Sequence, residues 1–234
     1  MNPTEILHDR EVTLSSGEVR LAGHLAIPAN AAGLVIFAHG SGSSRFSSRN
    51  RFVAERLNQA RLATLLFDLL TREEQAMDER TRELRFDIGL LGGRLVGVVD
   101  WAEGDDVTQG LPVGLFGAST GAAAALICAA RRAEVVRAVV SRGGRPDLAA
   151  DSLQAVRAPT LLIVGGLDRP VLDVNREAAA ALTVENRLEI VPGATHLFEE
   201  PGKLQQVAHL AARWFALHIM EKNDEHRQSH QGGR

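Results

Sequence analysis

The chain has 234 residues, of which 45% are hydrophobic and 24% are charged, and its formal net charge is −3. This composition is typical of a globular protein with a well-buried core, and it excludes a long disordered chain. The small negative charge gives no electrostatic reason to expect nucleic acid or an anionic membrane as a partner.

Neither a targeting segment nor a membrane span is expected. The N-terminal stretch lacks the basic and apolar regions of a signal peptide. No stretch reaches the roughly 18 uninterrupted apolar residues that a membrane span needs. The single cysteine, Cys128, excludes an intrachain disulfide. We therefore expect a cytoplasmic protein, and the sequence makes no prediction of its oligomeric state.

Apolar runs predict a sheet of about eight strands that begins with an antiparallel hairpin. The hairpin strands, 11–14 and 19–27, flank a glycine-containing loop at 15–18. Continuous apolar runs, typical of strands buried on both faces, follow at 34–38, 62–67, 113–116, 135–140, 160–164 and 187–191.

Helical patterns alternate with these strands. Apolar residues at helical spacing predict helices over 51–60, 87–101 and 204–218, and an alanine-rich helix follows Gly121. Residues 71–84 are dense in mixed charge and are interpreted as a solvated, partly helical connection. Residues 221–234 are polar and predict a disordered tail, so 1–220 is expected to form one domain.

This alternation predicts an α/β fold, with a mostly parallel sheet and helices on both faces. In such sheets, ligands bind outside the carboxyl ends of the strands. That rule selects the four loops that follow predicted strands, at 39–45, 117–121, 165–170 and 192–198.

The loop at 117–121 reads Gly-Ala-Ser-Thr-Gly and lies between a predicted strand and a predicted helix. This is the context of a nucleophile elbow, a strained turn that exposes a serine hydroxyl above the sheet. Ser119 is therefore the candidate nucleophile. The helix that follows directs its positive N-terminal end toward the place where negative charge would develop.

A serine hydroxyl needs an adjacent base that is itself oriented by an acid. His196 follows the last predicted strand and is the candidate base; Asp168 follows the preceding strand and is the candidate acid. Their chain order is Ser, Asp, His. Asp173 is the alternative acid. We expect the oxyanion donors to be the main-chain N–H groups of Thr120 and Ser41, with Gly42 as the alternative to Ser41.

The motifs HGSGSSR, GASTG, GGLD and GATHLF, in this order, resemble those of the α/β-hydrolase superfamily. The chain is most similar to the dienelactone-hydrolase-like branch, over nearly its whole length. The resemblance implies the same roles for Ser119, Asp168, His196, Ser41 and Thr120. Dienelactone hydrolases place cysteine at the elbow, so the serine here is a departure that argues against dienelactone as the substrate. Some relatives of this kind are joined to a phosphoribosyltransferase domain.

Two features bear on the substrate. The segment between the sixth and seventh predicted strands, 142–158, has only 17 residues. This is too short for a lid domain, so we expect an open site. Arg45, Arg142 and Arg145 lie near the carboxyl ends of predicted strands, where a substrate carboxylate or phosphate could be paired. They are candidate substrate-binding residues.

The sequence therefore predicts a serine hydrolase that cleaves small-molecule carboxylic esters, thioesters or lactones. A serine peptidase, an acyltransferase and a catalytically silent binding module are the alternatives. No metal or organic cofactor is implied, because the chain has no H-E-x-x-H, C-x-x-C or Walker motif.

Overall fold

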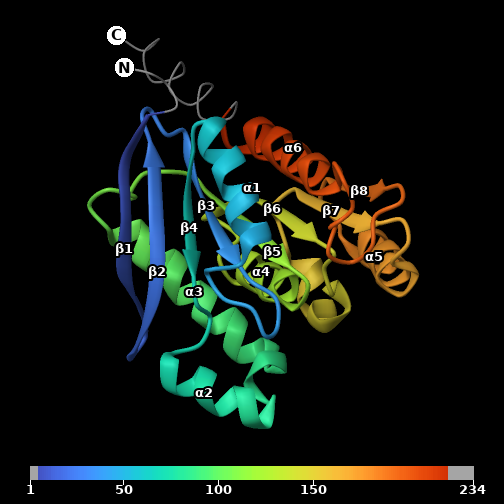
Figure 1. Ribbon diagram of the computed structural model, residues 1–234, viewed down its shortest axis with the longest axis horizontal. Helices are drawn as coiled ribbons and strands as arrows, with labels where there is room; N and C mark the ends of the chain where they lie inside the picture. The colour runs from blue at the N-terminus through green and yellow to red at the C-terminus, as the bar shows by residue number, and fades with distance from the viewer. Residues whose placement is uncertain (1–4, 221–234) are drawn as a thin grey trace.

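The computed structural model describes residues 5–220, and one eight-stranded sheet runs through them (Figure 1). The strand order is β1-β2-β4-β3-β5-β6-β7-β8. β1 and β2 are antiparallel to each other, β2 is antiparallel to β4, and the remaining neighbours are parallel. The strands are β1 Ile6–Ser16, β2 Val19–Pro28, β3 Gly33–Ala38, β4 Leu62–Phe67, β5 Val113–Ala118, β6 Val136–Arg142, β7 Thr160–Gly165 and β8 Asn186–Val191. The predicted α/β architecture is confirmed.

Helices cover both faces of the sheet (Figure 1). α1 and α6 pack with Val35, Phe37 and Phe116 on one face, while α3, α4 and α5 pack with Ile36 and Leu115 on the other. The alternation of neighbouring strand residues between the two cores is the period-2 pattern of a sheet buried on both sides. The helices are α1 Ser48–Gln59, α2 Arg72–Thr81, α3 Ile88–Gly104, α4 Thr120–Arg131, α5 Arg169–Ala181 and α6 Lys203–Phe215.

The N-terminal hairpin is longer than its apolar pattern indicates. β1 begins at Ile6, because the polar residues 8–10 pair along the backbone of β2 although their side chains are exposed. The connection is only Gly17 and Glu18, and Gly17 has φ 60°, a value that glycine adopts without a steric penalty. Backbone pairing, which leaves no hydrophobic signature, sets the length of this edge strand.

The charged segment expected to be a solvated connection forms α2, which follows β4 and lies beyond the end of that strand (Figure 1). Thr71 and Glu74 make a capping box at its start, with hydrogen bonds of 3.2 and 2.8 Å. The segment is partly helical as expected, but it is not wholly solvated. Asp78 is fully buried and accepts hydrogen bonds from both the main chain and the guanidinium of Arg85.

No separate layer is inserted between β6 and β7. The segment between them contains only short 3₁₀ turns over Pro146–Ala155, interrupted by a non-helical residue at Ala149. The fold therefore has no lid domain at this position, as predicted from its length. The predicted tail, 221–234, lies outside the described residues. Within 5–220, no helix has the length and apolar character needed to cross a bilayer.

Candidate active site

Ser119 occupies the sharp turn between β5 and α4. Its backbone has φ 52° and ψ −120°, a conformation that costs a non-glycine residue of order 1–3 kcal/mol and that clusters at functional sites. The flanking glycines permit the turn because a Cβ on Gly117 would lie 2.4 Å from Ala122 Cα, and one on Gly121 would lie 2.2 Å from the carbonyl oxygen of Ala38. The spacing of the motif is thus a steric requirement.

The last residue of β6 and the loop after it hold Ser119 through both of its main-chain polar groups. The Ser119 N–H donates to the carbonyl of Arg142 at 3.1 Å, and the Arg145 N–H donates to the carbonyl of Ser119 at 3.1 Å. These two hydrogen bonds oppose relaxation of the strained backbone. They also bring the loop after β6 beside the candidate nucleophile.

His196 and Asp168 are joined by a hydrogen bond of 2.6 Å between the imidazole Nδ1 and the carboxylate Oδ2. Asp168 directly precedes α5, just beyond the end of β7, and His196 lies in the loop that follows β8. The carboxylate is mostly buried, with 13% of its side chain exposed, whereas 37% of the imidazole is exposed. The shielded carboxylate of Asp168 thus orients an imidazole ring that solvent can reach.

The loop after β6 lies beside both the His196 imidazole and Ser119. A Cβ built on Gly143 would lie 3.4 Å from His196 Nδ1, and Gly143 directly follows the residue that accepts from the Ser119 N–H. Within the described residues, the Ser119 hydroxyl makes no hydrogen bond to His196. Such contacts are often long in enzymes without substrate and shorten in the substrate complex.

The alternative acid, Asp173, lies elsewhere. It is on the exposed side of α5 and pairs with Arg176 of the same helix at 3.0 Å. The structure therefore joins His196 to Asp168 and leaves Asp173 as a surface residue.

The two residues expected to supply oxyanion donors are in contact. The Ser41 N–H donates to Thr120 Oγ1 at 2.8 Å, so this amide is already engaged. Gly42, with φ 68°, completes a turn in which the Ser43 N–H donates to the carbonyl of Gly40 at 3.2 Å. Thr120 is the first residue of α4, and its own N–H has no partner within the helix.

His39 supports this loop from inside the protein. Its Nδ1 donates to the carbonyl of Gly40 at 2.9 Å, and its Nε2 accepts from the N–H of Leu69 at 3.1 Å. The bond accepted at Nε2 requires a neutral ring that carries its proton on Nδ1. Burial lowers the pKa of His39, and the contact with Gly40 and the charge of Asp68 oppose that shift only in part.

A second support comes from the charged segment, and sequence reasoning missed it. A Cβ on Gly42 would lie 3.2 Å from Arg85 Nη1, so the guanidinium packs directly against the loop after β3. This loop, residues 39–45, is called the oxyanion loop because one of the oxyanion donors is expected to come from it. Asp78 holds that guanidinium through Nε at 2.7 Å. The Arg85 hydrogen bonds keep the pKa of Asp78 below its usual range although burial opposes this. In the sequence, the only indication of this pair is that Arg85 follows Asp78 by seven residues and lies just after the end of α2.

The three candidate arginines have different surroundings. Arg45 is paired with Asp68 and lies 3.3 Å from Glu11. Arg145 binds Asp147 through two nitrogens, at 2.8 and 2.6 Å, and this pairing raises the pKa of Arg145. Arg142 is buried and makes no side-chain hydrogen bond within the described residues.

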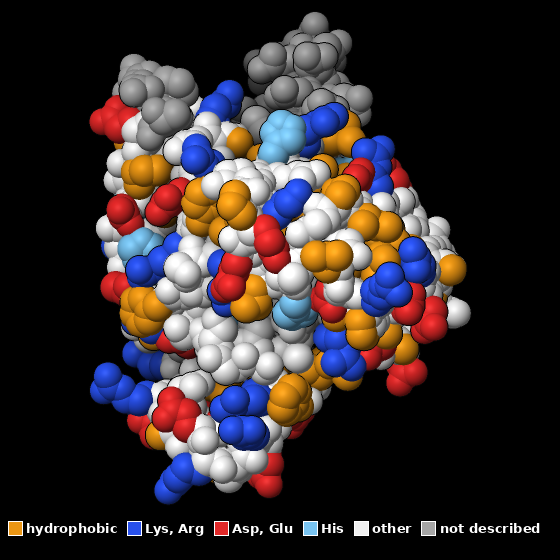
Figure 2. Space-filling model, turned by 45° about the vertical axis from the view of Figure 1, so that its right-hand side comes forward, with side chains coloured by type: hydrophobic (Ala, Val, Ile, Leu, Met, Phe, Trp, Pro, Cys, Tyr) orange, Lys and Arg blue, Asp and Glu red, His pale blue; other side chains and the backbone are white. Residues whose placement is uncertain are grey.

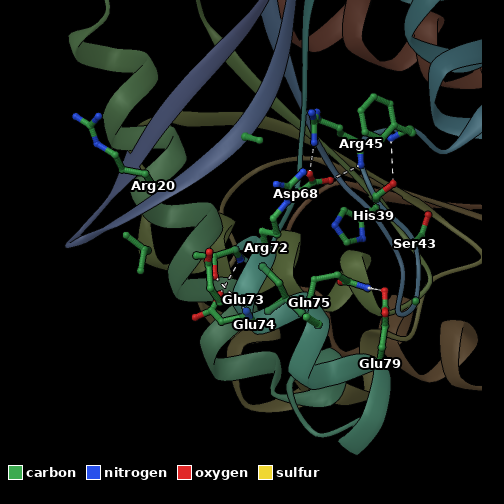
Figure 3. A pocket seen from close by; sticks show the side chains of 18 of the residues that line it. Arg20, His39, Ser43, Arg45, Asp68, Arg72, Glu73, Glu74, Gln75 and Glu79 are labelled. Atoms are coloured by element: carbon green, nitrogen blue, oxygen red, sulfur yellow. Dashed lines mark hydrogen bonds and ion pairs between the residues drawn. The ribbon is translucent and has the colours of Figure 1, made fainter.

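A groove of about 1390 Å³ borders the other side of the oxyanion loop. It lies between the β1–β2 turn, the loop after β3 and α2. Figure 3 shows Arg45 directed toward Asp68 beside His39, with Arg72, Glu73 and Glu79 on the wall that α2 provides. Ser119, His196 and Asp168 do not line this groove. Because Gly42 and Arg45 line it, the groove meets the candidate site at the loop after β3.

Charge does not concentrate on the face shown in Figure 2, where Lys and Arg side chains alternate with Asp and Glu. Within 5–220, no three His, Cys, Asp or Glu side chains are grouped so that they could hold a metal ion. The single cysteine is buried in α4, and burial raises its pKa to about 12. Cys128 is thus a buried, protonated thiol.

Comparisons with known proteins agree with this architecture. A dienelactone hydrolase from Anabaena variabilis ATCC 29413 has a crystal structure that matches with a TM-score of 0.90 and 60% identity, over 91% of this chain and 98% of that one. Est1E from Butyrivibrio proteoclasticus shares the fold, with a TM-score of 0.75 and 16% identity over 89% of this chain and 98% of its own.

Longer relatives are also present. Proteins of two Mycobacterium tuberculosis strains, each named "Putative phosphoribosyl transferase", are 59% identical over 213 residues, which is 91% of this chain but 47% of theirs. The chain thus spans about half the length of these relatives. The model of the dienelactone hydrolase family matches residues 21–220. On this match, and on the agreement with the Anabaena structure, the chain belongs to the dienelactone hydrolase family.

Proposed function

We propose that this hydrolase is a serine esterase that forms an acyl-enzyme on Ser119. The observation that carries the proposal is the strained backbone of Ser119 at a strand–helix turn, combined with the 2.6 Å bond between His196 and Asp168 at neighbouring strand ends. A nucleophile, a base and an acid that orients the base are the parts that acyl transfer requires.

In the proposed reaction, Ser119 Oγ attacks the acyl carbon and His196 Nε2 takes its proton. Asp168 stabilises the imidazolium through Nδ1 and remains ionised. Collapse of the tetrahedral intermediate expels the alcohol, which receives the proton from His196. Water then attacks the acyl-enzyme, gives a proton to His196, and releases the carboxylic acid as that proton returns to Ser119.

The oxyanion of both intermediates needs main-chain donors. We assign the Thr120 N–H as one, because α4 leaves it without an intrahelical partner and the positive end of the helix points there. The Ser41 N–H is the second candidate and would exchange Thr120 Oγ1 for the oxyanion. The Gly42 N–H makes no hydrogen bond within the described residues and remains the alternative.

The open site favours hydrolysis of small esters, with water as the acceptor of the acyl group. An alcohol in place of water would make the protein an acyltransferase, and product analysis with added alcohols separates the two activities. Peptidase activity has less support, because 5–220 contains no additional domain that would select peptides. We place the protein in the cytoplasm, as the sequence predicts, and cell fractionation tests this.

The name of the mycobacterial relatives describes proteins of which this chain covers 47%. We assign the hydrolase activity to the shared half. We assign the transferase named there to the half that this chain does not cover. A separate assay of the two halves tests this division.

Intact-protein mass after incubation with a fluorophosphonate tests the proposed nucleophile. We expect one adduct on the wild type and on Ser152→Ala, a matched serine variant in the 3₁₀ segment, and none on Ser119→Ala. A folded wild type that gains no adduct would contradict the proposal and would favour a catalytically silent binding module.

A further inference from the structure

Arg142, the last residue of β6, carries a buried charge without a counter-charge. Only 7% of the residue is exposed, and its Nε and Nη1 atoms have no acceptor within the described residues. Arginine keeps its proton at neutral pH even here, since burial lowers its pKa only to about 10. An isolated buried ion costs several kcal/mol of stability, so a guanidinium in this position calls for an anionic partner.

The surroundings of Arg142 are cationic rather than acidic. The charge that acts on it most directly is that of Arg49, which is repulsive and also lowers its pKa. Arg49 lies in the first turn of α1, whose N-terminal end carries a partial positive charge. Glu199 binds Nη1 of Arg49 at 2.9 Å, but Arg49 Nε is buried without an acceptor. Arg142 and Arg49, close enough for their charges to repel, therefore both have buried N–H groups without an acceptor among the described residues.

Arg142 adjoins the candidate nucleophile. Arg142 pairs with Ala118, the residue before Ser119, across the β5–β6 ladder. Its carbonyl accepts from the Ser119 N–H, and the next residue, Gly143, packs against the His196 ring. Adjacent parallel strands lie about 4.8 Å apart. The buried guanidinium of Arg142 is thus carried by the strand that directly flanks the candidate nucleophile.

We propose that Arg142 and Arg49, at the N-terminal end of α1, form an anion-binding subsite that receives a carboxylate or phosphate group carried by the ester substrate. This inference rests on the proposed esterase function and specifies its substrate class. Both oxyanions match the fork of N–H donors that a guanidinium presents. Arg45 and Arg145 do not share this role, because Asp68 and Asp147 already satisfy them.

The test compares kcat/KM for three 4-nitrophenyl esters of similar length: neutral butyrate, hemisuccinate with a terminal carboxylate, and 3-phosphonopropionate. The quantity measured is the ratio of each anionic ester to the neutral one. For Arg142→Met we expect this ratio to fall by about tenfold to a hundredfold from its wild-type value, as for loss of a charge-assisted bidentate contact. Arg142→Lys should keep part of the wild-type ratio of anionic to neutral kcat/KM. The lysine ammonium keeps the positive charge but cannot donate two parallel N–H bonds as a guanidinium does.

Arg137→Met is the matched control, since Arg137 lies on the same strand with an exposed side chain. Its ratios should stay within about twofold of the wild type, as for surface substitutions. The anionic ester that loses more in Arg142→Met shows whether the subsite prefers a carboxylate or a phosphonate, which stands in for a phosphate group. Equal losses on neutral and anionic esters, or ratios that match the wild type, would overturn the proposal by making Arg142 a structural residue.

A second measurement uses the wild type, in case Arg142→Met fails to fold. Calorimetry and competition with the butyrate ester should show millimolar binding of succinate or inorganic phosphate, and none of the neutral analogue succinamide. Absence of binding by both anions would overturn the subsite. Failure of the esterase proposal is distinct, since it would appear as missing fluorophosphonate labelling whether or not the anions bind.

Discussion

Replacement of Gly121 by alanine tests whether the elbow depends on close contact between α4 and the end of β3. The added Cβ would lie 2.2 Å from the carbonyl oxygen of Ala38 and 2.4 Å from that of His39. Both atoms belong to the main chain, so no side chain can rotate away. Relief requires the start of α4 and the end of β3 to separate by about 1 Å, since real Cβ contacts are essentially never closer than 3.0 Å.

Overpacking typically costs 1–3 kcal/mol, so we expect Gly121→Ala to lose about 3 kcal/mol. For a domain of this size, 1 kcal/mol shifts Tm by about 2–4 °C, which gives a decrease of about 6–12 °C. The displaced segment is also the start of the oxyanion loop. Because a misplacement of about 1 Å can cost about a hundredfold in rate, kcat on a 4-nitrophenyl ester should fall by a similar factor.

Circular dichroism during heating measures the first effect, and initial rates measure the second. Gly93→Ala is the control, because a Cβ on Gly93 in α3 meets nothing within 4 Å. Alanine there should raise stability by about 0.5–1 kcal/mol through its helix propensity. If Gly121→Ala melts within about 2 °C of the wild type, less than 1 kcal/mol is lost and the steric argument is wrong.

Two further predictions concern the site. Asp168→Asn should lower kcat on 4-nitrophenyl butyrate by about 10³–10⁴ with little change in KM, since the base loses its orienting charge. Asp173→Asn should stay within about twofold of the wild type, and a comparable loss in the two variants would refute the assignment of the acid. For His39, the lowered pKa means that the unfolded chain binds more protons than the folded one below about pH 6.5. The contribution of His39 to stability is therefore complete above that pH and is lost as pH falls toward the lower folded pKa. In urea unfolding between about pH 5 and 7, the free-energy difference between wild type and His39→Asn should narrow on acidification, and a constant difference would contradict this.

The fold and the candidate site differ in how far the sequence predicts them. The sheet and its hairpin follow from apolar periodicity, and Ser119, Asp168 and His196 follow from the rule that ligands bind where parallel strands end. The structure places Asp168 against His196. The positions of these three residues could be predicted locally, because each lies directly after a strand that is visible in the sequence.

Contacts between distant segments were not predictable in this way. The sequence ranks Arg45, Arg142 and Arg145 together, and only the folded chain shows that two of them are neutralised. Likewise, the start of α1 at Ser48 depends on Ser47, whose hydroxyl accepts from the Asn50 N–H at 3.3 Å. A serine in a serine-rich loop gives a weak signal for a helix cap. The burial of Asp78 could not be predicted either, because it depends on Arg85, which packs against the distant Gly42.

The two main-chain hydrogen bonds that join Ser119 to Arg142 and Arg145 have an evolutionary consequence. Both hydrogen bonds involve main-chain atoms of Ser119, so the turn is held independently of the atom that its side chain carries. Exchange of a hydroxyl for a thiol would therefore leave the scaffold of the elbow intact. The side chain at position 119 can therefore change by a single substitution without rebuilding the turn, whereas a change at Gly117 or Gly121 would disturb the turn itself.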